Sequence, residues 1–186
     1  MRDLVTLSEY KVYSSIASTE YDAKIQGIIT KVSALIKEYC GRTLIDYSNG
    51  TSFLDIEEYF DGSYQNYYTR EFPIQSINTI EYSYDNGQNY TSLVEFTDYA
   101  LSKQKDRIAI LHDDGTEQLN KYRLVYTAGF LNTPEDLKLA VLDLVDYYYK
   151  GEATPKRMSN FVTIEYVKTS DFPPHIKRIL DLYRTI

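Results

Sequence analysis

Residues 20–41 read EYDAKIQGIITKVSALIKEYCG, and this stretch decides the fold expected for the first part of the chain. Its apolar side chains recur at three- and four-residue spacing, which places them on one face of a helix. These side chains are Ile25, Ile28, Ile29, Val32, Leu35, Ile36 and Tyr39. Gly41 follows them, and a glycine at that position ends a helix in a left-handed conformation at low cost. We therefore predict a helix over residues 20–40.

Further helices are predicted on both sides of this one. Thr6-Leu7-Ser8-Glu9 has the spacing of a capping box and predicts a short helix over about residues 7–14. Thr133 as N-cap and Pro134 as first helical residue predict a helix over residues 134–150. Its apolar stripe is Leu137, Ala140, Val141, Leu144, Val145 and Tyr148. Pro173-Pro174 predicts the start of a last short helix.

The segment between these helices has the composition of strands. Residues 51–128 are rich in Tyr, Thr, Ile, Val and Phe, and the turns in it favour positive φ. The predicted strands are 52–60, 69–72, 76–84, 98–102, 107–111 and 121–127. Asp85-Asn86-Gly87 and Asp113-Asp114-Gly115 are the turns, and the second is predicted to pair Arg107–Leu111 with Tyr122–Thr127. The expected fold class is α+β: a mainly α-helical body of two long helices and short terminal helices, with a β-rich insertion between the long helices.

Charge divides the chain into two expected domains, a body at 1–150 and a C-terminal docking arm at 151–186. Residues 150–186 hold seven Lys/Arg and four Asp/Glu, while residues 1–149 hold thirteen and twenty-three. A basic arm on an acidic body indicates docking on an acidic neighbour. An uneven charge distribution without a function is the alternative. Removal of the arm at Gly151 is expected to abolish docking and leave the body folded.

Composition disfavours several classes of function. The net charge of −7 argues against direct DNA binding, because phosphate contacts come from clustered Lys and Arg. No apolar run is long enough for a membrane span, and the N-terminus predicts no secretory signal. Cys40 is the single cysteine and is expected to be a buried apolar residue. His112-Asp113-Asp114 is interpreted as a turn rather than a metal site. We therefore predict no enzyme, catalytic residue, metal or cofactor.

Four stretches resemble the head–tail connector (adaptor) proteins of tailed bacteriophages. The first joins Leu4–Lys11, Tyr21–Ile25 and Tyr39–Thr43, and the second joins Glu58–Gly62 and Phe72–Ile77. The third runs from Val125–Phe130 into Thr133–Val141, and the fourth joins Val162–Tyr166, Phe172–Pro174 and Ile179–Arg184. Their order and spacing cover nearly the whole chain. Arg157–Phe161 departs from the Gly, Ser and Glu of related sequences, which bears on how the arm docks.

The resemblance implies a structural virion protein made in the host cytoplasm and assembled in the neck. It implies a homo-oligomeric ring of about twelve copies, closed by heterologous contacts. The ring would bind the portal protein and a tail or stopper protein, and DNA would pass through its lumen without specific binding. The rival interpretations are a tail-completion or stopper protein of the same neck, and a small tyrosine-rich binding module.

Candidate contact residues follow from this interpretation. Arg42 and the tyrosines Tyr147 and Tyr149 are candidates for the subunit interface, since Tyr148 is expected in the apolar stripe. A helix stop followed by an ordinary exposed base is the alternative for Gly41-Arg42. The candidate portal-docking residues of the arm are Lys156, Arg157, Phe161, Ile164, Tyr166, Lys177, Arg178, Tyr183 and Arg184.

Overall fold

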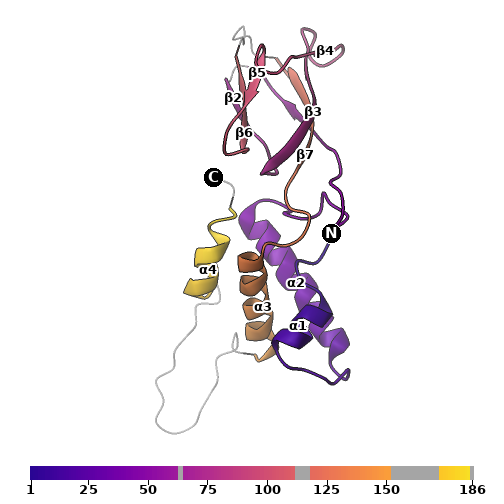
Figure 1. The fold of residues 1–186 in the computed structure, drawn as a ribbon, viewed down its shortest axis with the longest axis vertical. Coiled ribbons are helices and arrows are strands. Elements are labelled where there is room, and N and C mark those ends of the chain that lie inside the picture. Colours follow the sequence, from indigo (N-terminus) through magenta and orange to yellow (C-terminus); the bar gives the residue numbers. More distant parts are fainter. Residues whose placement is uncertain (63–64, 112–117, 152–171, 185–186) are drawn as a thin grey trace. The chain divides into compact units, whose positions relative to one another are not determined.

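The chain folds into two compact units in the computed structural model, which describes residues 1–62, 65–111, 118–151 and 172–184. The helical unit comprises Met1–Arg42 and Thr133–Ile186, and the β unit comprises Thr43–Asn132. Four helices and seven strands lie in the described residues, with every helix in the first unit and every strand in the second. Figure 1 traces the elements of each unit.

The helical unit is built on two helices, α2 (Asp22–Cys40) and α3 (Glu135–Tyr149), which pack against each other. The short helices α1 (Leu7–Tyr13) and α4 (Pro174–Leu180) each contact both of them (Figure 1). The buried side chains of α2 and α3 come from the apolar stripes that the sequence showed. They include Ile25, Ile29, Val32 and Ile36 of α2, and Leu137, Ala140, Val141, Leu144 and Val145 of α3.

The ends of α1 and α2 follow the local signals in the sequence. Thr6 caps α1, its hydroxyl accepting from Glu9 N, and the Glu9 carboxylate accepts in return from Thr6 N. At the end of α2, Gly41 adopts φ 69°, and Arg42 N donates to Lys37 O at 3.2 Å. Both terminations are therefore local effects of capping and of glycine.

The prediction that Thr133 caps α3 is wrong. Pro134 is the N-cap residue, and no side chain caps the helix. The Thr133 hydroxyl instead donates to Leu4 O at 2.5 Å. The Thr133 side chain is therefore directed to the carbonyl of a remote segment, and it accepts no hydrogen bond from the first turn of α3.

The β unit contains two antiparallel sheets. The four-stranded sheet has the order β1-β7-β3-β4, and the three-stranded sheet has the order β2-β6-β5. Their bounds are Ile56–Phe60 (β1), Asn66–Tyr68 (β2), Ile74–Tyr82 (β3), Thr91–Ser92 (β4), Tyr99–Leu101 (β5), Arg107–Ile110 (β6) and Tyr122–Ala128 (β7). Side chains of both sheets share one core. Tyrosines form much of it, with the Tyr122 ring 5.3 Å from both the Tyr67 and the Tyr82 ring.

Two strand predictions are wrong. Arg107–Leu111 was predicted to pair with Tyr122–Thr127, but β6 pairs with β2 and β5, and β7 pairs with β1 and β3. The turn Asp113-Asp114-Gly115 lies outside the described residues. The strand expected at 69–72 ends earlier, as β2 at Asn66–Tyr68. Local turn chemistry is compatible with many partners, and the shared core decides which strands pair.

One tight turn of the β unit is as its residues predicted. Asn86 and Gly87 have φ 57° and 84°, in the connection between β3 and β4. After β7, Gly129 has φ 85° and ends the strand. A Cβ at Gly129 would lie 2.6 Å from Leu44 O, so only glycine fits there without a shift of the backbone.

The expected fold class is wrong in its emphasis. The chain is not a mainly helical body with an insertion, because four short helices accompany seven strands in two sheets. The residues between α2 and α3 form a compact unit with its own apolar core. The sequence showed the helical stripes clearly, whereas the weight of the β unit depends on pairings between distant segments.

Candidate functional site

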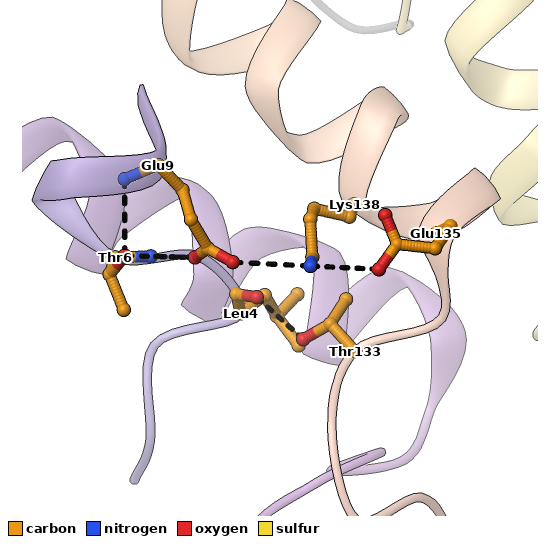
Figure 2. A network of polar contacts seen from close by, with 6 residues as sticks. All are labelled: Leu4, Thr6, Glu9, Thr133, Glu135 and Lys138. Atoms are coloured by element: carbon orange, nitrogen blue, oxygen red, sulfur yellow. Dashed lines mark hydrogen bonds and ion pairs between the residues drawn. The ribbon is translucent and has the colours of Figure 1, made fainter. Parts of the chain in front are cut away.

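A polar network joins α1 to the start of α3 and fixes one face of the helical unit. Figure 2 shows Lys138 of α3 between two carboxylates, with its Nζ 3.1 Å from Glu9 Oε1 and 2.9 Å from Glu135 Oε1. Burial alone would raise the pKa of Glu9. The hydrogen bonds from Thr6 and Lys138 outweigh that effect, so the pKa of Glu9 is lowered. The spacing of Glu135 and Lys138 could have indicated their ion pair, but no local signal links either residue to Glu9.

The N-terminal segment is held against the helices by its backbone. Thr133 binds the Leu4 carbonyl, as Figure 2 shows, and Leu4 N donates to Ser33 Oγ at 2.9 Å. Lys37 Nζ of α2 donates to Arg2 O at 2.6 Å. The segment before α1 is thus an ordered part of the helical unit.

Tyrosine hydroxyls bind the carboxylates along α3. The pairs are Tyr183 with Asp136, Tyr13 with Asp143, and Tyr10 with Asp146. Burial, followed by the neighbouring carboxylate, raises the pKa of Tyr10 to about 12. The hydrogen bond to Asp143, followed by burial, raises the pKa of Tyr13 to about 12. These bonds let an acidic helix pack against α1 and the C-terminal segment without a cation at each carboxylate.

The candidate interface residue Arg42 is buried, with 3% of its surface exposed. It follows Gly41 at the end of α2. Burial raises the pKa of both Cys40 and Tyr183, and the nearby positive charge of Arg42 offsets part of that rise. The expected exposed base is therefore not seen. A contact between Arg42 and a neighbouring copy stays a prediction, and it would require the guanidinium to be reached from a surface near Tyr183.

The three tyrosines that end α3 are exposed in a different order from the one predicted. Tyr148, expected in the apolar stripe, is exposed, whereas Tyr147 and Tyr149 are half-buried. The Tyr149 ring packs edge-on against Tyr10 at 6.1 Å, and Lys24 lies 5.4 Å from its centroid. Because α1 meets the last turn of α3 on the Tyr149 side, Tyr148 points away from the core.

Some of the candidate arm residues lie in the described part of the chain, and the others lie outside it. Lys156, Arg157, Phe161, Ile164 and Tyr166 lie outside the described residues, and so does most of the predicted arm. The others lie on α4 or directly after it: Lys177 and Tyr183 are half-buried, and Arg178 and Arg184 are exposed. The two exposed arginines are thus the described arm residues that are most accessible to a partner.

Helix α4 belongs to the core of the helical unit. Ile176 and Leu180 are buried, and Leu180 O lies 3.8 Å from Cys40 Sγ. Tyr39 of α2 donates to Asp181 at 2.5 Å and packs edge-on against Phe172 at 4.9 Å. Residues 172–181 are therefore packed in the helical unit. The expectation that removal of residues 151–186 leaves the body folded stays a prediction, and the packing of α4 argues against it.

The acidic charge is concentrated in the β unit. Thr43–Asn132 carry fourteen Asp/Glu and six Lys/Arg, a net charge of −8, while the remaining residues carry thirteen and fourteen, a net charge of +1. Most of the acidic excess of residues 1–149, −8 of a net charge of −10, therefore lies in the β unit.

Features typical of other classes of protein are few in the described parts of the chain. No group of three His, Cys, Asp or Glu residues could hold a metal ion there, and His112-Asp113-Asp114 lies outside them. Cys40 is buried, and burial raises the pKa of its thiol to about 11. None of the described helices is both long and apolar enough to cross a bilayer.

The same fold occurs in chains of gene transfer agent (GTA) particles. One chain from the neck of an empty GTA particle, computed with C6 symmetry, matches 98% of this chain and 90% of its own length, with a TM-score of 0.58 and 16% identity. A chain from the virion of a native GTA particle matches the same shares, with a TM-score of 0.61 and 15% identity. A chain from a native GTA neck computed with C12 symmetry matches 100% of this chain and 94% of its own, with a TM-score of 0.57 and 14% identity.

The sequence identifies the class as a structural protein of a phage virion. The head completion protein of Escherichia phage T5 is 25% identical over 194 residues, which cover 98% of this chain and 99% of that protein. The chain belongs to the head completion protein family, whose model matches residues 3–186. The resemblance to phage head–tail connector proteins is thereby confirmed.

Proposed function

We propose that this protein forms a ring beneath the portal in the neck of a tailed phage, where it connects head to tail and extends the DNA channel. The observation that carries the proposal is the match of the head completion family over residues 3–186. Two of the chains that share the fold come from GTA necks, computed with C6 and C12 symmetry. A ring of about twelve copies would close by repetition of one heterologous contact.

The segment after α3 is proposed to dock on the portal. Arg178 and Arg184 are exposed at the described end of this segment, and the guanidinium of Arg184 lies 5.2 Å from the Tyr39 ring. Exposed arginines suit an acidic protein surface, because each guanidinium can bind a carboxylate through two parallel hydrogen bonds. The portal surface that the arm meets is therefore expected to be acidic.

The β unit is proposed to line the channel or face it. Its net charge of −8 would repel the phosphates of DNA and let the duplex slide without specific contacts. This reading assigns no reaction to the protein.

A specific observation favours a second candidate, a small binding module in the β unit. Tyr82, Tyr84 and Tyr122 line a hollow of about 270 Å³ together with Asp98. Aromatic rings beside one carboxylate are a common lining for small polar ligands. A screen of soluble sugars by calorimetry tests this candidate, and binding lost in Tyr84→Ala would favour it. A stopper or tail-completion role in the same neck is a further alternative, and it differs less from the proposed connector role than a binding module does.

The proposed function is tested by co-expression with the portal protein of the same phage and electron microscopy of the product. A second ring stacked on the portal would support the connector role, and a monomer beside intact portals would favour the tail-completion role. The arm is tested with residues 152–171 replaced by a Gly/Ser sequence of equal length, which keeps α4 in the chain. Its matched control replaces residues 86–89 in the β unit. Portal binding retained by the arm variant would remove residues 152–171 from the docking assignment.

A further inference from the structure

A loop of the β unit presents a phenylalanine ring to solvent. Residues 93–98 connect β4 to β5, and Phe96 in this loop is 80% exposed. Val94 and Glu95 beside it are exposed as well. Large exposed apolar side chains that stand together are typical of surfaces that bind another protein.

Hydrogen bonds hold this loop in one conformation. Asp98 Oδ2 accepts from Val94 N at 2.7 Å, and Asp98 N donates to Val94 O at 2.8 Å. Phe96 N donates to O of the buried Tyr99 at 2.7 Å. Phe96 has φ 64°, which is unfavourable for any residue with a Cβ. The fold thus holds the backbone of this loop in one conformation, so little backbone freedom is lost when the Phe96 ring binds.

The helical unit carries a concave apolar surface on α1. A hollow of about 470 Å³ is lined by Leu7, Val12, Ile16 and Ala17, with Lys11 among them. The hollow is open to solvent, and the turn after α1 forms part of its lining; in this turn Ile16 N donates to Lys11 O at 2.9 Å. Val12 is exposed in it. We call this surface the α1 hollow.

The loop and the α1 hollow are complementary in charge. Glu95 adjoins Phe96 in a unit of net charge −8, whereas the α1 hollow holds the ammonium of Lys11 in a unit of net charge +1. Lys11 Nζ also lies 2.7 Å from Asp22 Oδ1, so Glu95 would share this ammonium with Asp22. A carboxylate that approaches beside an apolar ring would find a cation beside an apolar surface.

We propose that Phe96 of one copy seats in the α1 hollow of the next copy. The contact is heterologous, because it joins the β unit of one copy to the helical unit of another, and such contacts can close a ring. This inference deepens the proposed function and rests on it, since it names the residues that join neighbouring copies.

The contact is tested with cysteines placed on its two sides. Copies with Thr97→Cys and larger, tagged copies with Ser15→Cys are mixed, assembled on the portal and oxidised with diamide. Thr97 and Ser15 are exposed, and Cys40 stays unreactive because it is buried with a raised thiol pKa. A disulfide-linked pair of one small and one large copy is the expected product. Asn89→Cys, exposed on another turn of the β unit, is the matched control.

Each outcome decides one of the two proposals. A ring on the portal without the Thr97–Ser15 product, or with no more of it than Asn89→Cys gives, overturns the contact and leaves the ring standing. Failure of the unmodified chain to form a ring overturns the proposed function.

A second variant separates the contact from folding. Phe96→Gly removes the phenyl side chain. Glycine adopts the positive φ of this position without strain, so the variant is expected to fold. It is expected to weaken assembly by more than about tenfold, whereas Leu119→Ala, another exposed apolar residue of the β unit, is expected to leave assembly unchanged. Equal assembly of both variants would overturn the contact.

Discussion

Replacement of Leu180 by alanine tests whether α4 is part of the core of the helical unit. The Leu180 side chain is 0% exposed, and loss of a fully buried leucine side chain to alanine costs about 2–5 kcal/mol. Leu182→Ala is the matched control, because Leu182 lies two residues further along and is 73% exposed. The control is expected to change the free energy of unfolding by less than about 0.5 kcal/mol.

Urea unfolding followed by helical circular dichroism measures this difference. With a denaturant slope of about 2 kcal/mol per molar, Leu180→Ala should lower the midpoint by about 1–2.5 M relative to the control. The reasoning is refuted if both variants unfold at the same midpoint. Amide hydrogen exchange locates the effect: protection should fall in α2 and α3 as well as in α4. If protection fell in α4 alone, detachment of this helix would cost less free energy than keeping it packed over the cavity left by Leu180→Ala.

Four further predictions concern single positions. Gly129→Ala should destabilise the β unit by more than about 2 kcal/mol, because its φ is 85° and its Cβ would lie 2.6 Å from a backbone oxygen. Gly27→Ala, with open space around its Cβ in α2, should instead stabilise the helical unit by about 0.5–1 kcal/mol. Urea unfolding measures both variants, and a change in unfolding free energy of the opposite sign in either would contradict its prediction. Thr133→Val deprives the Leu4 carbonyl of its hydroxyl donor and should cost about 1–3 kcal/mol in the same assay; an unchanged midpoint would contradict this. The hydrogen bond from Tyr13 to an α3 carboxylate, followed by burial, raises the pKa of Tyr13 to about 12, above the value of about 10 in an unfolded chain. Its contribution to stability is therefore complete below about pH 10 and is lost as the pH rises toward 12. Stability measured over this range should fall less steeply in Tyr13→Phe, and identical slopes would count against the assignment.

The positions of the helices could be read from the sequence because their signals are local. The stripe from Ile25 to Ile36 and the capping box of Thr6 and Glu9 depend on residues three or four positions apart. The same is true of the left-handed Gly41 that ends α2. Thr133 shows the limit of such signals, since a good N-cap residue is used by Leu4, which lies far away in the sequence.

The candidate surfaces depended on tertiary contacts that no spacing reveals. The structure buries Arg42 and exposes Tyr148, because burial at a helix end is set by the neighbouring element, which lies beside Tyr183 in one case and is α1 in the other. Phe96 gave no signal in the sequence. Its exposure and its positive φ result from the hydrogen bonds of Asp98 and Tyr99.

The sequence by itself determined the four helical segments of the described residues, the turn at Asn86-Gly87 and, through the order of its motifs, the resemblance to phage connectors. Only the tertiary structure decided that β7 lies between β1 and β3, that α4 closes the helical core, and that the acidic charge gathers in the β unit. Helices and turns are stabilised within a few residues of the chain. Strand order and burial depend instead on a core assembled from distant segments, whose partners are fixed only when the whole unit folds.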